Sequence, residues 1–238
     1  MFASLLHHDD ARRATEVVTA VLAHGLRCAL TGGLAVDAQL RVHGRPVQQR
    51  ALNDIDFVVE DFASIPGSLA ASFLPHHVHP DATHGRTLLQ LVDEPRAIRL
   101  DLFHALGRTL SRAVALDEET GALSVLAVED LVARTTALVC GSLRLGHCVD
   151  AKHVTAFTRL IGLGRPEQLA AAWNDHRQQV PGTLDSASRE AAGLLEAHPE
   201  LVVVEQYSRD APPCERCRAH GPFRPAPPRR IVEILGYC

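Results

Sequence analysis

Residues 30–59 read LTGGLAVDAQLRVHGRPVQQRALNDIDFVV, and this stretch decides how the N-terminal half of the chain is expected to fold. It begins where a short apolar run, Leu26–Leu30, predicts a buried strand. Gly32 and Gly33 interrupt the apolar run, and Leu34–Leu40 continues with helical periodicity. The glycine pair is therefore expected at a junction between a strand and a helix.

Two carboxylates, Asp54 and Asp56, stand one residue apart at the start of a second expected strand, Ile55–Val59. Residues i and i+2 of a strand point to the same face, so the two acids are expected to project together. Carboxylates held that close repel each other unless a cation lies between them. A third acid, Asp101, lies inside the apolar strand expected over Ala97–Phe103, where an unpaired buried acid would be costly.

The three acids predict a magnesium site, because Mg²⁺ prefers hard oxygen ligands and keeps room for water and phosphate. Convergence of Asp54, Asp56 and Asp101 would suit two ions about 4 Å apart, which hold the attacking and leaving oxygens of an in-line displacement. The glycine pair fits the same chemistry, since backbone N–H groups at Gly32 and Gly33 can approach phosphate closely. The following helix adds the positive end of its dipole.

Two side chains beside the glycine pair and the acid pair are further candidates for nucleotide binding. Thr31 offers a hydroxyl next to the glycines, and Arg50 precedes Asp54 by four residues. We expect Arg50 to reach a triphosphate or to brace the loop over residues 43–53.

The segment Gly32–Ala38, with Arg50 ahead of Asp54 and Asp56, resembles the signature of the polymerase beta nucleotidyltransferase superfamily. It is most similar to the bacterial branch that contains aminoglycoside nucleotidyltransferases and abortive-infection-type toxins. The resemblance covers roughly residues 11–165. It implies that the paired acids and Asp101 bind catalytic metal and that the substrate is a nucleoside triphosphate (NTP).

The helical half carries a looser part of this resemblance. Val128–Ala133 resembles the start of the family's helical half, and Lys152 is a weaker match assigned to nucleotide binding. The toxin-like branch usually has a lysine at the position of Thr135, so Arg134 or Lys152 would have to supply that charge. Thr135 keeps open the alternative of a catalytically inactive nucleotide-binding regulator or a toxin–antitoxin component.

The expected fold class is α+β, with a small mixed β-sheet flanked by helices (the nucleotidyltransferase fold) and followed by a helical half. We place the nucleotidyltransferase-like core at residues 1–115, the helical region at 116–200, and a Pro-, Arg- and Cys-rich tail at 201–238. The remaining expected elements are helices over 11–25, 128–139, 150–161, 166–177 and 187–197, a short helix within 61–74, and strands over 86–92 and 124–126.

The tail contains a Cys-x-x-Cys pair, Cys214 and Cys217, followed by His220 and the terminal Cys238. Four such ligands could form a tetrahedral structural zinc site. The alternatives are ordinary thiols, or an interaction surface through which the chain assembles with a partner protein.

Composition limits the remaining choices. The net charge of −4 argues against broad, sequence-blind nucleic-acid binding, which needs many phosphate-neutralising Lys and Arg residues. No apolar stretch is long enough for a membrane span, and the N-terminus lacks a secretory pattern, so we expect a cytoplasmic chain without a membrane partner. The expected activity is transfer of a nucleoside monophosphate (NMP) from an NTP to the hydroxyl of an RNA, a protein or a small molecule.

Overall fold

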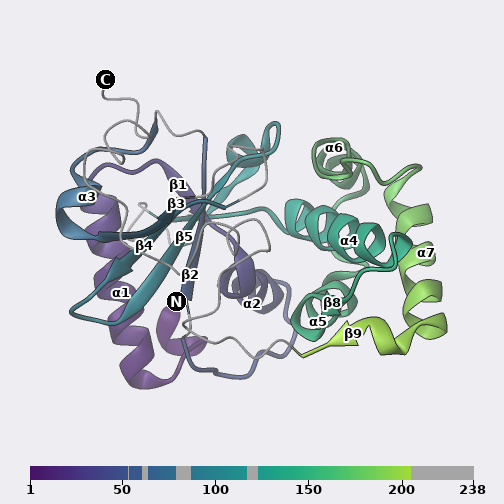
Figure 1. The fold of residues 1–238 in the computed structure, drawn as a ribbon, viewed down its shortest axis with the longest axis horizontal. Helices are drawn as coiled ribbons and strands as arrows, with labels where there is room; N and C mark the ends of the chain where they lie inside the picture. The colour runs from purple at the N-terminus through teal and green to yellow at the C-terminus, as the bar shows by residue number, and fades with distance from the viewer. Residues whose placement is uncertain (53, 61–63, 79–86, 117–122, 205–238) are drawn as a thin grey trace.

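The structure is a computed structural model that describes residues 1–52, 54–60, 64–78, 87–116 and 123–204. It confirms the α+β class, a mixed sheet flanked by helices and followed by a helical half. Figure 1 shows the sheet with α1, α2 and α3 in one part and α4–α7 in the other. Helix α2 lies at the junction, where it packs against β2 and also against α4 and α5.

Among the described residues, seven strands form one sheet in the order β3-β4-β5-β2-β1-β7-β6. Strands β1 and β7 are parallel, β2 and β5 are parallel, and the other neighbouring pairs are antiparallel. The strands are β1 Cys28–Leu30, β2 Asp54–Val59, β3 Leu74–Val78, β4 Thr87–Asp93, β5 Ile98–His104, β6 Val114–Ala115 and β7 Ser124–Val125.

The helices cover the sheet and build the second part of the molecule. They are α1 His8–Ala23, α2 Gly32–Val42, α3 Leu69–Ser72, α4 Val128–Arg144, α5 Ala151–Leu160, α6 Pro166–His176 and α7 Leu184–Ala197. Two short parallel strands, β8 Val149–Asp150 and β9 Val202–Val203, close the helical part. No described helix has the length and apolar character needed to cross a membrane.

Two clusters of buried apolar residues correspond to the two parts. The larger lies around the sheet and includes Ile55 and Phe57 of β2 and Leu100 and Leu102 of β5. The smaller lies among α4–α7 and includes Trp173, whose indole N–H donates to the Gly182 carbonyl at 2.9 Å. Strand β7 and the first turns of α4 belong to the larger cluster, so the sheet extends into the chain beyond residue 115.

The parallel register of β2 and β5 positions the acids. Asp54 is paired with Arg99, and Asp56 is paired with Asp101. Because alternate residues of a strand share a face, these four residues form a square on one face of the sheet. Ile55 and Leu100 point to the other face and are fully buried there.

The strands and helices predicted from alternation and from helical periodicity are present in the structure, and their boundaries differ from the predicted ones by a few residues. The segment expected to contain a short helix has one of only four residues, α3, followed by the edge strand β3. The sequence pattern does not predict a strand around Pro75, because proline has no N–H to donate and is confined in sheets to edge strands, strand starts and bulges. The register of β3 against β4 shifts between Pro75 and His77.

Candidate active site

Asp54, Asp56 and Asp101 converge on one face of the sheet. Each offers a carboxylate oxygen, and these atoms lie within 4.8 Å of one another; among the described residues this is a group able to hold a metal ion. Asp101 is only 5% exposed, whereas Asp54 and Asp56 are half-buried. We name the three residues the acidic triad.

Burial and mutual repulsion raise the pKa values of two acids of the triad, Asp56 and Asp101. Burial, with the nearby charges of Asp54 and Asp101, raises the pKa of Asp56 to about 8. Burial and Asp54 also raise the pKa of Asp101, although Arg99 opposes the effect. A strained cluster of this kind is typical of functional sites, because a fold without use for the charges gains nothing from holding them together.

The junction between β1 and α2 lies directly against the triad. Gly32 has φ +65°, and a Cβ atom built on it would come within 1.7 Å of Asp56 Oδ2. Glycine is therefore required here by both backbone conformation and space. The backbone N–H of Thr31 donates to the Asp56 carbonyl at 2.8 Å, which fixes the junction to β2.

The first turn of α2 is a candidate place for an anion to bind. The Thr31 side chain does not cap the helix, and the first-turn N–H groups of a helix have no partner within it. Thr31 is fully buried, and its hydroxyl accepts a hydrogen bond from Arg134 Nη1 at 2.7 Å. Thr31 thus serves to hold Arg134 in this structure.

Arg50 lies over the same turn. Its Nη2 would be 2.7 Å from a Cβ on Gly33, so the absence of a side chain at Gly33 lets the guanidinium approach the helix start. Arg50 Nε donates to Asp37 Oδ2 at 2.9 Å, and the other Asp37 oxygen lies 3.4 Å from Arg159 Nη1 of α5. Asp37, one turn beyond Gly33, therefore aims Arg50 and ties α2 to the helical half.

Arg134 brings the helical half to the triad. It extends from α4, donates to Thr31, and lies 4.9 Å from the centroid of the Phe103 ring. Burial lowers the pKa of Arg134, while the charge of Asp56 opposes that shift. Arg134 also lines a small hollow together with Phe103 and His176.

A second cation, Arg99, lies inside the acidic triad. Its Nη2 donates to Asp54 Oδ2 at 2.6 Å, and its Nε lies 3.2 Å from Asp101 Oδ1. Neither that Nε nor that Oδ1 forms a hydrogen bond of regular geometry with any described residue.

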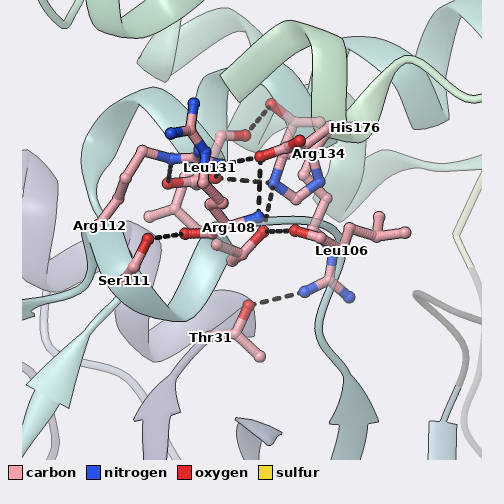
Figure 2. Close-up of polar contacts among 12 residues, drawn as sticks. Thr31, Leu106, Arg108, Ser111, Arg112, Leu131, Arg134 and His176 are labelled. Atoms are coloured by element: carbon pink, nitrogen blue, oxygen red, sulfur yellow. Dashed lines mark hydrogen bonds and ion pairs between the residues drawn. The ribbon is translucent and has the colours of Figure 1, made fainter. Parts of the chain in front are cut away.

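The loop after β5 is fastened to the helical half by a buried charge network (Figure 2). Asp130 of α4, which is fully buried, accepts hydrogen bonds from Arg112 at 2.6 and 2.9 Å. His176 Nε2 of α6 lies 2.9 Å from Asp130 Oδ1, and Arg112 also pairs with Asp175 at 2.7 Å. Burial alone would raise the pKa of Asp130, but Arg112 and His176 lower it. We call this network, formed by Arg112, Asp130, Asp175 and His176, the latch. It fastens α4, which carries Arg134, to the loop after β5.

Lys152 lies in the first turn of α5. Its backbone N–H donates to Asp150 at 2.9 Å, and its ammonium is 3.5 Å from Asp150 Oδ2. Burial, Lys152 and Arg134 together lower the pKa of the neighbouring His153 to about 4. The charges of Lys152 and Arg134 therefore both act on His153, while the charge of Asp150 opposes them. The four expected zinc ligands, Cys214, Cys217, His220 and Cys238, lie outside the described residues.

Two observations test whether the triad fits a divalent metal ion. The donor set is three carboxylates, the hard oxygen ligands that Mg²⁺ takes. Asp101 Oδ1 is buried and has no regular hydrogen bond, as expected of an atom with an unused coordination capacity. The residues fit such an ion, and Asp54, Asp56 and Asp101 would hold it.

Comparisons with known proteins give one partial structural alignment. No protein-family model matches the chain, and no curated protein matches it. One solved structure, that of the antibiotic-resistance factor ANT(2'')-Ia, aligns with 79% of this chain and 96% of its own at 13% identity and a TM-score of 0.46.

Sequence reasoning overlooked two parts of the site. Arg99 stands two residues before Asp101, so the same alternation that joins Asp54 to Asp56 places it on the triad's face. Asp37 stands four residues after Gly33, a helical spacing that puts both on one side of α2. Nothing in the sequence indicated the latch, because its members are spread from Arg112 to His176 and come from the loop after β5, from α4 and from α6.

Proposed function

We propose that the chain is a metal-dependent nucleotidyltransferase that moves an NMP group from an NTP to an acceptor hydroxyl. The observation that supports this most is the convergence of Asp54, Asp56 and Asp101 beside the uncapped start of α2. Carboxylates for a divalent ion and free helix amides for phosphate are the two halves of a triphosphate site.

Each residue has a role in this proposal. The acidic triad would hold Mg²⁺, with two ions suited to the reaction, and the ion would neutralise the charge that develops on the phosphates. The amides of Gly32 and Gly33 would receive phosphate oxygens, and Arg50 would pair with the triphosphate above them. Lys152 is proposed as a further nucleotide contact. Thr31 acts indirectly, since its hydroxyl is engaged by Arg134.

The reaction is an in-line displacement. The acceptor oxygen forms a bond to the α-phosphorus, and the bond from that phosphorus to the bridging oxygen breaks, so pyrophosphate leaves. The acceptor hydroxyl must lose its proton; in this proposal it would lie beside Asp101, whose carboxylate would accept that proton. Most of the acceleration would come from positioning and charge neutralisation, as in phosphoryl transfer generally.

The alternative, a catalytically inactive nucleotide-binding regulator, depends on Thr135. That residue is buried, and its hydroxyl donates to Leu131 O at 2.8 Å within its own helix, so it offers no charge to the site. Its neighbour Arg134 donates to Thr31 and interacts electrostatically with Asp56, so a positive charge is supplied beside the triad, which favours an active enzyme over the alternative. The role of a toxin–antitoxin component stays a proposal, as does the choice of RNA, protein or small molecule as the acceptor.

The test is incubation of the purified chain with each α-labelled NTP, Mg²⁺ and three acceptor pools: tRNA, total protein, and aminoglycosides. We expect label to enter one pool with stoichiometric release of pyrophosphate. The pool that takes the label identifies the acceptor class.

Matched variants decide what a positive result means. The double variant Asp54→Asn/Asp56→Asn should lose transfer, while Arg96→Gln, which removes two ion pairs with residues outside the triad, should retain it. Transfer at the native rate by the double variant would refute the site. Absence of labelling, with NTP still bound, would support the regulator instead.

A further inference from the structure

Arg99 occupies a place in the acidic triad that a metal ion would need. Two of the three acids, Asp54 and Asp101, lie 2.6 and 3.2 Å from its guanidinium nitrogens. Burial alone would lower the pKa of Arg99, but Asp101, Asp54 and Asp56 together raise it. The guanidinium is thus the counter-charge of the triad.

A divalent ion and this guanidinium cannot share the triad at low cost. A doubly charged ion and a guanidinium that both lie against the same carboxylates would repel each other, because like charges a few ångströms apart interact strongly in a partly buried site. The two cations would also draw on the same carboxylates, Asp54 and Asp101. Binding of the ion would therefore weaken the attraction that holds Arg99 at Asp54.

Arg99 is partly open to solvent. Its side chain is 32% exposed, and it contacts the triad through a hydrogen bond from Nη2 to Asp54 and an ion pair from Nε to Asp101. Arg134, by contrast, is anchored by the buried Thr31 hydroxyl and lies against the Phe103 ring. Arg99 can therefore turn toward solvent while Arg134 stays in place.

We propose that Arg99 is a resident counter-cation that balances the acidic triad in the metal-free protein and is displaced from Asp54 when a divalent ion binds. This inference rests on the proposed function, because it takes the triad to be a metal site. It explains how three crowded acids are tolerated before the ion arrives. It also implies that the native arginine weakens metal binding.

The experiment measures Mn²⁺ affinity of the full chain by electron paramagnetic resonance, which counts free Mn²⁺, at pH 7.5. We expect Arg99→Gln to bind Mn²⁺ at least tenfold more tightly than the wild type. Metal-free Arg99→Gln should melt at a lower temperature, and saturating Mn²⁺ should raise its melting temperature by more than that of the wild type.

The matched control is Arg96→Gln. Arg96 is equally exposed at 32% and also bridges two carboxylates, Glu16 and Asp93, but it lies outside the triad. Its removal should leave Mn²⁺ affinity unchanged.

A second measurement uses the wild type alone, so it stands if Arg99→Gln fails to fold. With ¹⁵N-labelled arginine, the Arg99 Nε–H resonance, assigned by its loss in Arg99→Lys, should shift on Mg²⁺ addition. The Arg96 resonance should stay in place. A stationary Arg99 resonance under saturating Mg²⁺ would overturn the proposal.

The outcomes separate the two claims. Mn²⁺ binding by the wild type with equal or weaker affinity in Arg99→Gln would overturn the counter-cation role and leave the metal site standing. If neither protein bound Mn²⁺, the metal site would fail, and the proposed function would fail with it.

Discussion

Replacing Asp56 by Asn should stabilise the metal-free protein while it abolishes nucleotidyl transfer. Asp56 lies with its ligand oxygen within 4.8 Å of those of Asp54 and Asp101. Two unit charges at that separation repel by about 3 kcal/mol at an effective dielectric constant of about 20. The substitution removes this repulsion but also the attraction of Arg134 and Arg99 for Asp56, which offsets part of the gain.

We expect a net gain of about 1–2 kcal/mol, which corresponds to a rise of about 3–6 °C in melting temperature for a chain of this size. The gain depends on pH. The raised pKa of Asp56 means that the folded protein holds a proton that the unfolded chain releases, so native stability is lost as pH rises from about 4 to about 8. The variant should match the wild type near pH 4.5 and exceed it at pH 8.5.

Differential scanning calorimetry in the presence of a chelator, at several pH values, measures this directly. The control is Asp93→Asn, because Asp93 is also buried but accepts two hydrogen bonds from Arg96. That variant should lose stability, because asparagine cannot replace the charge that pairs with Arg96. A lower melting temperature of Asp56→Asn at pH 8.5 would show that the triad is not a strained cluster.

Three further outcomes follow from the same structure. Gly32→Ala should lose Mn²⁺ binding and about 1–3 kcal/mol of stability, because its φ is positive and the new Cβ would overlap Asp56; native affinity in a titration would contradict the reasoning. Asp130→Asn should lower the unfolding free energy by about 3–5 kcal/mol, since it removes the buried charge that pairs with Arg112. Arg189→Gln, at an exposed pair, should cost under about 1 kcal/mol in the same urea titration; equal losses would show that the latch contributes no more than an exposed ion pair. Mg²⁺ should raise the melting temperature more at pH 8 than at pH 5.5, because at the lower pH a proton on Asp56 competes with the ion. An equal rise at both pH values would show that the ion does not bind to Asp56.

Local sequence signals were enough to place the triad. Alternation along a strand put Asp54 beside Asp56, and an acid inside an apolar run indicated that Asp101 has a special environment. The glycine pair predicted a strand-to-helix junction, and Gly32 does have the conformation that requires glycine. These inferences succeed because each depends on residues within a few positions of one another.

Contacts between elements that lie far apart in the sequence could not be predicted from local sequence patterns. The pairing of Asp130 with His176 and Arg112 depends on how α4 and α6 meet the loop after β5, which no local pattern encodes. Alternation puts Arg99 on the face of Asp101, but its contact with Asp54 depends on the register of β2 against β5, which no local pattern shows. Arg50 was expected at the phosphates, but its pairing with Asp37 required the packing of the loop on α2.

The most direct measurement is anomalous diffraction from crystals of the full chain soaked in Mn²⁺. We expect an anomalous peak within coordination distance of carboxylate oxygens of Asp54, Asp56 and Asp101, with the Arg99 guanidinium withdrawn from Asp54. A peak elsewhere, or a triad without one at saturating Mn²⁺, would contradict the central claim that these three acids form a metal site.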